Sequence, residues 1–156
     1  GGGGGEVEVG GQRILPEHSA VWHIFSSADT QRLAELLPTV LPGAAPSGSL
    51  LLDSPAYLSA DTLASLERTA GVRPYIVLLA VGDVLLVPAG CAHQVAHLRP
   101  CVSVCAGFVA PEHVSHAARL SAQRKLLPPG HRRRADVLGL EGLLLNAACA
   151  AALALE

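Results

Sequence analysis

One histidine stands where its ring could bind a metal ion. His93 lies in the stretch "GDVLLVPAGCAHQV", residues 82–95, in which an apolar run leads to a Pro-Ala-Gly corner and a second apolar run follows. A strand that begins at a corner fixes the direction of its first side chain, and imidazole is a common metal ligand. Two interpretations stay open on this pattern alone: a metal ligand, or a core histidine that donates to a backbone carbonyl.

The other histidines and the cysteines form no clear metal site. His113 and His116 are three residues apart on a predicted helix, and we interpret them as part of a solvated helix face rather than as a ligand pair. The four cysteines include no CxxC pair, which excludes a zinc ribbon. Cys101 and Cys105 lie in an apolar run, so we expect both to be small, buried, free thiols.

The composition excludes several classes of partner. The chain has 156 residues, a formal net charge of −2, 50% hydrophobic residues and only 3% aromatic residues. It therefore offers one modest core, little stacking surface for single-stranded nucleic acid and no strong charge imbalance. We expect no sequence-specific reading of nucleic acid. The one basic run, Arg132 to Arg134, indicates a solvated helix start, with phosphate binding as the alternative.

The first part of the chain predicts a flexible segment, a strand and two helices. Residues 1–13 are rich in glycine and read as a flexible segment, and the chain contains no methionine, so we expect a fragment of a longer protein. The stretch "HSAVWHIFSS" predicts a short strand. A helix follows, capped by Ser27 or Asp29 and limited by Pro38. A second helix is predicted between its cap Ser59 and the glycine stop at residue 71.

Four short strands and two more helices follow. The strands are predicted in "YIVLLA", "DVLLVP", "HQVAHL" and "CVSVCAGFV", and the helices in residues 110–127 and 135–156. Glu141 and Asn146 interrupt the last helix, so we expect no membrane span. Short antiparallel strands with tight corners are typical of half a barrel or sandwich, and their open edges imply further strands upstream. We divide the chain into a flexible segment (1–13), a barrel part (14–140) and a C-terminal helix (141–156).

Three segments carry a family resemblance. They are "AVWHIFSSADTQRLAELL", "AYLSADTLASLERTAGVRPYIVLLAVGDVLLVPAGCAHQV" and "CVSVCAGFVAPEHVSHAARLSAQRKLLPPGHRRRADVL". From Val21 to Leu140 the chain resembles the C-terminal half of the JmjC oxygenase domain of histone lysine demethylases. Within that family it is most similar to the branch of the histone H3 lysine-9 demethylases and Hairless, of plant or green-algal type. The joint occurrence of "GD", "PAG" and "HQV" with "FVAPEHV" makes the resemblance specific.

The resemblance implies a fold and a chemistry. It implies a mainly β fold with flanking α-helices: part of a double-stranded β-helix, or cupin-like jelly roll, with C-terminal helices. It implies Fe(II) held by two histidines and one carboxylate, with 2-oxoglutarate and O₂ used to hydroxylate N-methyl lysine and release formaldehyde. His93 matches the distal histidine of that triad. The histone H3 tail and chromatin are the implied partners, and the nucleus is the implied compartment.

The sequence departs from the family pattern in ways that bear on activity. No histidine is followed two residues later by Asp or Glu, so the other two iron ligands lie outside this sequence, as do the main 2-oxoglutarate anchors. We name no catalytic or cofactor-binding residue, and we expect the isolated chain to be inactive. His97 replaces a usual Asn, either as a donor beside the iron site or as a partly exposed strand residue. An inactive corepressor or scaffold module is the alternative function. Trp22 and Tyr57 are expected to anchor helices on the barrel.

Overall fold

The computed structural model describes residues 7–41, 57–131, 134–136 and 139–154, apart from the side chain of residue 111. The chain divides into two compact units. The first, here called the sheet unit, comprises residues 1–42 and 55–104. The second, here called the helical unit, comprises residues 43–54 and 105–156.

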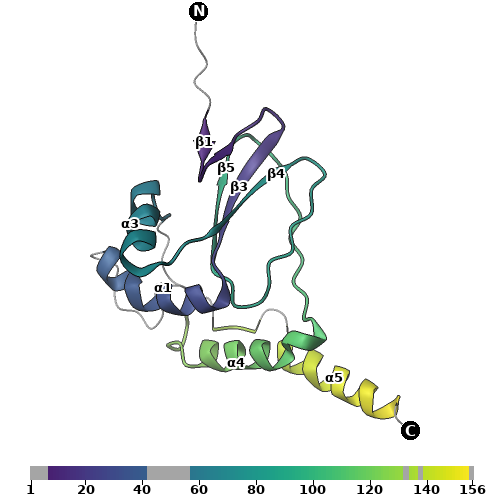
Figure 1. Ribbon diagram of the computed structural model, residues 1–156. Helices are drawn as coiled ribbons and strands as arrows, with labels where there is room; N and C mark the ends of the chain where they lie inside the picture. Colours follow the sequence, from purple (N-terminus) through teal and green to yellow (C-terminus); the bar gives the residue numbers. More distant parts are fainter. Residues whose placement is uncertain (1–6, 42–56, 132–133, 137–138, 155–156) are drawn as a thin grey trace, which may run out of the picture. The chain divides into compact units, whose positions relative to one another are not determined.

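A three-stranded antiparallel sheet forms the centre of the sheet unit (Figure 1). Its strands are β3 (His18–Ile24), β4 (Tyr75–Ala80) and β5 (His93–His97), in the spatial order β4-β3-β5. The strands predicted in "HSAVWHIFSS", "YIVLLA" and "HQVAHL" are therefore confirmed. These runs are rich in β-branched and long aliphatic residues, which pack well on a pleated surface. The result is compatible with part of a jelly roll, because all three strands are antiparallel.

The register divides the side chains between two faces of the sheet. Trp22 pairs with Val77 of β4 and with Val95 of β5, whereas His23 pairs with Ile76 and Gln94. Because side chains alternate along a strand, paired residues share one face and their neighbours share the other. The front face carries the side chains of Ala20, Trp22, Ile24, Val77, His93, Val95 and His97. The back face carries the side chains of Val21, His23, Ile76, Leu78, Gln94 and Ala96.

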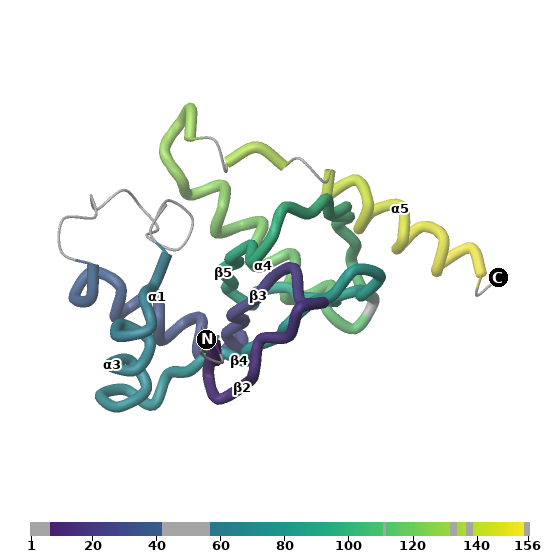
Figure 2. The backbone as a smooth tube through the Cα atoms, turned by 90° about the horizontal axis from the view of Figure 1, so that it is seen from above, coloured from purple at the N-terminus to yellow at the C-terminus, as the bar shows by residue number. Residues whose placement is uncertain are grey.

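Two helices complete the sheet unit, and they lie side by side (Figures 1 and 2). Helix α1 (Ser27–Val40) is capped by Ser26, whose Oγ accepts from the backbone nitrogen of Asp29 at 3.0 Å. The cap is thus one residue before the predicted Ser27, and Pro38 lies inside α1 instead of limiting it. The bond from Leu41 nitrogen to the oxygen of the buried Leu37 carries the helix past this proline.

Helix α3 (Ala60–Ala70) has the two ends that the sequence predicts. Ser59 Oγ accepts from the backbone nitrogen of Thr62 at 3.2 Å, and Gly71 ends the helix with φ of +64°. Arg32 of α1 donates to the oxygen of Ala70 and so joins the two helices. The core of the sheet unit consists of the buried residues Ala20, Val21, His23, Ile24, Phe25, Leu33, Leu37, Leu58, Leu66 and Val72.

Part of the predicted flexible segment forms a hairpin. Strands β1 (Glu8–Val9) and β2 (Gln12–Arg13) pair antiparallel around Gly10 and Gly11, whose φ angles are +57° and +75°. Two residues with positive φ suit a two-residue hairpin turn, and glycine adopts that conformation without steric cost. The glycines therefore produce a turn here instead of a linker. Residues 1–6 lie outside the described part of the chain.

Two predicted strands are absent from the described structure. Residues 84–87 and 101–109 have strand-like sequences, yet neither segment is hydrogen-bonded as a strand. Val84 and Leu86 are exposed, as are Val102, Val104 and Phe108. A β-strand is held by a neighbouring backbone, and an apolar pattern alone provides none. Both strand predictions are therefore wrong for this chain as described.

The helical unit consists of η1 (Pro111–His113), α4 (Val114–Lys125) and α5 (Leu140–Leu153). Both predicted helices are confirmed, although the first opens with a short 3-10 turn and the second begins five residues later than predicted. Lys125 of α4 forms an ion pair with Glu141 of α5. Arg124 donates to the oxygen of Ala135 at 2.7 Å, which links α4 to the segment before α5.

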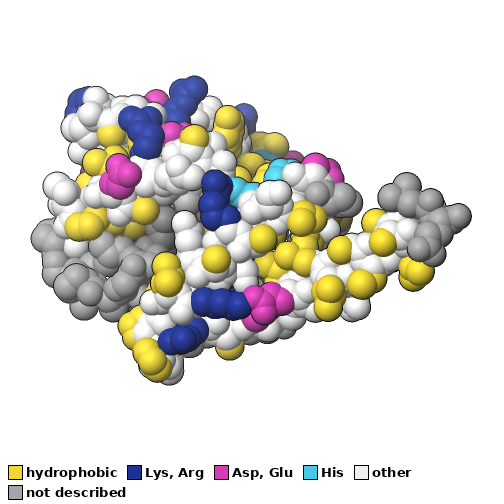
Figure 3. Space-filling view, turned by 90° about the horizontal axis from the view of Figure 1, so that it is seen from below, with side chains coloured by type: hydrophobic (Ala, Val, Ile, Leu, Met, Phe, Trp, Pro, Cys, Tyr) yellow, Lys and Arg dark blue, Asp and Glu magenta, His cyan; other side chains and the backbone are white. Residues whose placement is uncertain are grey.

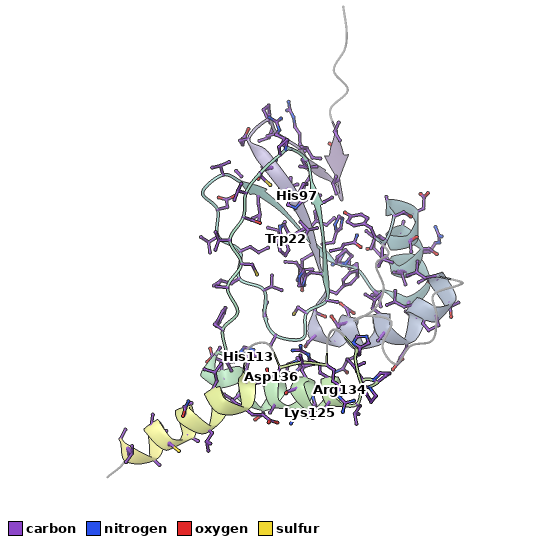
Figure 4. All side chains as sticks on the ribbon, turned by 180° about the vertical axis from the view of Figure 1, so that it is seen from behind. Trp22, His97, His113, Lys125, Arg134 and Asp136 are labelled. Atoms are coloured by element: carbon purple, nitrogen blue, oxygen red, sulfur yellow. The ribbon has the colours of Figure 1, made fainter. Side chains whose placement is uncertain are left out.

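The one residue of the predicted basic run that the structure describes lies in a turn and not at a helix start. Arg134 lies in a turn, where its Nη1 donates to the oxygen of the buried Leu127 at 2.9 Å. Figure 4 labels Arg134 together with Lys125 and Asp136 of the same unit. Arg132 and Arg133 lie outside the described residues, so phosphate binding by this run stays a prediction.

Helix α5 is mostly apolar, with Glu141 and Asn146 as its polar residues. Leu143, Leu145 and Leu153 are exposed, and Figure 3 shows hydrophobic side chains along this helix. Within the described residues, none of the helices has the length and apolar character needed to cross a membrane.

The C-terminal end of α3 provides a test of the fold. Replacing Gly71 by Ala should lower the free energy of unfolding by about 1 kcal/mol, because an L side chain is strained at φ of +64°. No atom lies within 4 Å of the added Cβ, so the cost is conformational only. Gly71→Asn is the matched control and should cost less, since Asn tolerates this conformation. Urea unfolding of the three proteins measures the order; equal losses for Ala and Asn would contradict it.

Candidate functional site

A hydrogen-bonded corner positions His93 at the start of β5. The nitrogen of Phe25 donates to the oxygen of Ala92 at 2.8 Å, and the nitrogen of Ala92 donates to Thr30 Oγ1 at 2.8 Å. The nitrogen of Cys91 donates to the oxygen of Pro88 at 3.3 Å and closes the Pro-Ala-Gly turn. Phe25, which directly follows β3, and Thr30 of α1 therefore fix the backbone immediately before His93.

One ring nitrogen of His93 makes a hydrogen bond, and the other makes none to the part of the chain that the structure describes. Its Nδ1 lies 3.2 Å from the oxygen of Cys91. A carbonyl oxygen only accepts, so in the neutral ring Nδ1 carries the proton and Nε2 keeps its lone pair. This arrangement is the usual one for a metal-binding imidazole, in which the second nitrogen donates to a carbonyl or carboxylate.

Trp22 stacks on the imidazole of His93. The ring centroids are 5.4 Å apart and the planes are inclined by 26°. The two residues come from neighbouring strands and share the front face of the sheet, where Figure 4 labels Trp22 and His97. The stack restricts rotation of the imidazole about its χ2 angle. Trp22 therefore restrains the ring of His93, and its expected role as an anchor for a helix stays a prediction.

The histidine is not a core residue, because its side chain is exposed. It does donate to a backbone carbonyl, as the core interpretation expected, yet it does so from the surface of the front face. The donor set fits one ligand of an iron site. Among the described residues, no group of three His, Cys, Asp or Glu side chains lies close enough to hold a metal ion. The metal assignment of His93 stays a prediction.

Gln94 fixes β5 from the back face. Its Oε1 accepts from the nitrogen of Leu58 at 2.9 Å, and its Nε2 donates to the oxygen of Leu58 at 3.0 Å. The side-chain amide thus pairs with one residue's backbone as a neighbouring strand would. Leu58 is buried, so without these two bonds its backbone N–H and C=O groups would lie in the core unpaired. The strand that carries His93 is therefore held on both faces.

His23 and Tyr57 form a second contact on the back face. The Tyr57 hydroxyl lies 3.4 Å from His23 Nδ1, and the two rings meet edge to face with centroids 6.1 Å apart. His23 is the one buried polar or charged side chain among the described residues. Burial lowers the pKa of its imidazole, because desolvation disfavours the charged form. Tyr57, which precedes α3 in the chain, therefore contacts the sheet. This is in line with its expected anchoring role.

The remaining predicted residues are only partly where the sequence places them. His97 is exposed on the front face, and its Nδ1 lies 3.1 Å from Cys101 Sγ. Cys101 and Cys105 are free, as predicted, but exposed, because their segment forms no strand. His113 is exposed as expected. His116 is half-buried: its Nδ1 contacts Arg119 at 2.8 Å, and its Nε2 is buried without a hydrogen-bond partner in the described structure.

Sequence reasoning missed Trp22 and Gln94 as supports of His93. Strand alternation in "HSAVWHI" and "HQVAH" does assign Trp22 and His93 to one face once the pairing register is known. The register depends on the hydrogen bonds of the corner at Ala92, and no local pattern reports those bonds. The two hydrogen bonds between the Gln94 side chain and the Leu58 backbone link positions 36 residues apart, and no pattern in the sequence predicts this contact.

Comparison with known proteins gives a consistent set of relatives. No protein-family model matches the chain. The chain is 30% identical over 132 residues to lysine-specific demethylase 3A of Gallus gallus, an alignment that covers 82% of this chain. It is 30% identical over 138 residues to lysine-specific demethylase 3 of Drosophila melanogaster, covering 86% of this chain. It is 40% identical over 116 residues to lysine-specific demethylase hairless of Mus musculus, covering 73%.

These alignments cover a small part of each relative. The chain spans 10% of the length of the Gallus gallus and Mus musculus proteins and 16% of that of the Drosophila melanogaster protein. The homologues of this chain are thus lysine demethylases, and the homology concerns one segment of much longer proteins.

Removing the two hydrogen bonds between the Gln94 side chain and the Leu58 backbone should destabilise the sheet unit. Gln94→Ala loses two hydrogen bonds and leaves a buried backbone donor and acceptor unpaired, at a cost of about 2–3 kcal/mol. The exposed Gln31 on α1 is the matched control, and Gln31→Ala should change the free energy of unfolding by less than about 0.5 kcal/mol. Chemical denaturation measures both variants. Equal effects of the two substitutions would contradict the structural role of Gln94.

Burial of His23 should make stability depend on pH. The lowered pKa means that the unfolded state binds a proton first as pH falls below about 6.5. The contribution of neutral His23 is complete above that pH and is lost as pH falls toward the folded-state pKa. We therefore expect the stability difference between wild type and His23→Asn to shrink from pH 7.5 to pH 5. An unchanged difference across this range, measured by urea unfolding, would refute the expectation.

Proposed function

We propose that this chain is a segment of an Fe(II)- and 2-oxoglutarate-dependent histone lysine demethylase of the JmjC kind, and that His93 is one of its three iron ligands. The observation that carries the proposal is the state of the His93 ring. Nδ1 donates to the oxygen of Cys91, and Nε2 is left with its lone pair on the front face of the sheet. The relatives, which are lysine-specific demethylases, support the demethylase assignment.

The chain's own residues would serve to orient this one ligand. The carbonyl of Cys91 selects the tautomer, and the indole of Trp22 limits rotation of the ring. The bonds of Gln94 to Leu58 hold the strand from the opposite face. A ligand held in this way loses little conformational freedom when it binds a metal, which favours tight binding.

One histidine does not complete an iron site. The bound iron, with 2-oxoglutarate and O₂, would supply the oxidising chemistry that hydroxylates an N-methyl group of lysine. The other two ligands and the 2-oxoglutarate anchors would come from residues outside this sequence, because no histidine here is followed two residues later by Asp or Glu. The isolated chain is therefore proposed to be inactive.

The finer assignments follow from the motif resemblance. The "PAG" and "HQV" residues and the "FVAPEHV" segment favour the branch that acts on lysine 9 of histone H3. We accordingly propose the histone H3 tail as substrate, chromatin as the setting and the nucleus as the compartment. No membrane association and no sequence-specific reading of nucleic acid by this segment are proposed.

An inactive corepressor or scaffold module is the second candidate. Both candidates are compatible with the absence of a three-ligand group among the described residues. The transcript upstream of this sequence separates the two candidates. A strand with His-x-Asp or His-x-Glu would support the oxygenase, because that pair completes the facial triad with His93. Other residues at that place would support the scaffold.

The role of His93 can be tested in the intact parent protein. His93→Ala should lower iron content and demethylation of a methylated H3 lysine-9 peptide by at least about 10–100-fold, the loss expected when even an outer partner of a metal ligand is removed. Bound iron is measured by elemental analysis, and formaldehyde release reports the reaction. A far-ultraviolet circular dichroism spectrum should be unchanged, because the side chain is exposed.

The matched control replaces another exposed histidine. His113→Ala, in the helical unit, should keep both iron and activity. If the His93→Ala protein still couples 2-oxoglutarate decarboxylation to demethylation, then His93 is not an iron ligand and the assignment falls. If the wild-type parent binds iron but shows no demethylation of any lysine peptide, the scaffold is favoured.

A further inference from the structure

A thiol and an imidazole meet just beyond the end of β5. His97 is the last residue of that strand, and its Nδ1 lies 3.1 Å from the Sγ of Cys101. Both side chains are exposed. The proposed iron chemistry uses neither residue. A cysteine within hydrogen-bond reach of a histidine is the arrangement that activates sulfur as a nucleophile, with the imidazole as general base.

We propose that Cys101 is a modification site for small peroxide oxidants, and that His97 is the base that activates it. In the arrangement proposed, the thiol donates its hydrogen to Nδ1 across the 3.1 Å contact, and the proton of the neutral ring lies on Nε2. The sulfur is accessible, since the segment from 101 to 108 is exposed throughout. A peroxide molecule is small enough to approach such a sulfur along the line required for displacement.

The reaction is an oxygen transfer that balances without any further reagent. As Nδ1 takes the thiol proton, sulfur attacks one oxygen of hydrogen peroxide and forms an S–O bond. The O–O bond breaks, and the leaving hydroxide takes the proton back from the imidazolium. The products are the sulfenic acid of Cys101 and one water molecule; sulfur is oxidised by two electrons and the peroxide is reduced.

The other cysteines provide comparisons within the same molecule. Cys105 and Cys149 are also free and exposed, but neither makes a hydrogen bond to a histidine ring in the described structure. Cys91 is half-buried, and burial raises the pKa of its thiol against the opposing effect of a backbone hydrogen bond at Ser27. The proposal therefore ranks Cys101 first among four thiols, and exposure alone does not give that ranking.

Site-resolved labelling tests this ranking. The full chain is treated with limiting hydrogen peroxide in the presence of dimedone, which traps sulfenic acids, and the adduct on each cysteine is quantified by tandem mass spectrometry. We expect Cys101 to be labelled about tenfold faster than Cys105 or Cys149, a modest gain for an exposed general base. Equal rates for the three exposed cysteines would overturn the proposal.

The role of His97 is tested by His97→Asn, which keeps a polar side chain but removes the base. The rate at Cys101 should fall about tenfold, to that of Cys105, while the rates at Cys105 and Cys149 stay the same. Added imidazole should restore part of the rate at Cys101 in His97→Ala, which a merely structural role would not allow. An undiminished rate at Cys101 in His97→Asn would assign the reactivity to exposure and refute the base. If either variant misfolds, the ratio of rates in the wild-type chain still decides the ranking.

Discussion

The central position of β3 is the constraint on which the sheet unit depends. This strand pairs with β4 on one side and with β5 on the other, so its alternation sets which side chains share a face. Trp22 is thereby placed beside His93 on the front face, and His23 lies across from Gln94 on the back face. A slip of one residue in either pairing would exchange these partners, because successive side chains point to opposite faces. The site and the core are thus fixed by one register.

That register is held at its end by contacts outside the ladder. The bonds of Phe25 and Thr30 to the backbone of Ala92 join the start of β5 to the end of β3 and to the first turn of α1. The cap at Ser26 fixes that first turn. A helix cap therefore acts on the position of a histidine 67 residues later in the chain, through two hydrogen bonds and no direct contact. Stability of the helix start and orientation of His93 are coupled for this reason.

Elements whose ends are set by nearby residues could be predicted from the sequence, whereas contacts between distant residues could not. Ser59 and Gly71 mark both ends of α3, because a capping hydroxyl and a residue with positive φ are needed within a few positions of the helix itself. Resemblance singled out His93 as a candidate ligand, but only the structure shows which nitrogen is free. The partners of that ring could not be predicted, since Trp22 is brought to His93 by pairing across 71 residues. The glycines at 10 and 11 misled the prediction because the same residue type serves both a linker and a hairpin turn.

In two exposed apolar segments the sequence predicts a strand and the structure has none. Residues 84–87 and 101–109 carry the composition of strands, yet Val84, Val102 and Val104 are at least 85% exposed. Each of these side chains could be buried only if another backbone paired with its segment and another surface covered it. The apolar pattern of these segments indicates a preference for strand pairing, but no backbone among the described residues pairs with them. Placement of Cys101 on such a segment explains why a thiol expected in a core is instead accessible, with the Nδ1 of His97 3.1 Å from its sulfur. The same unmet pairing therefore accounts both for the failed strand prediction and for the chemistry now open to Cys101.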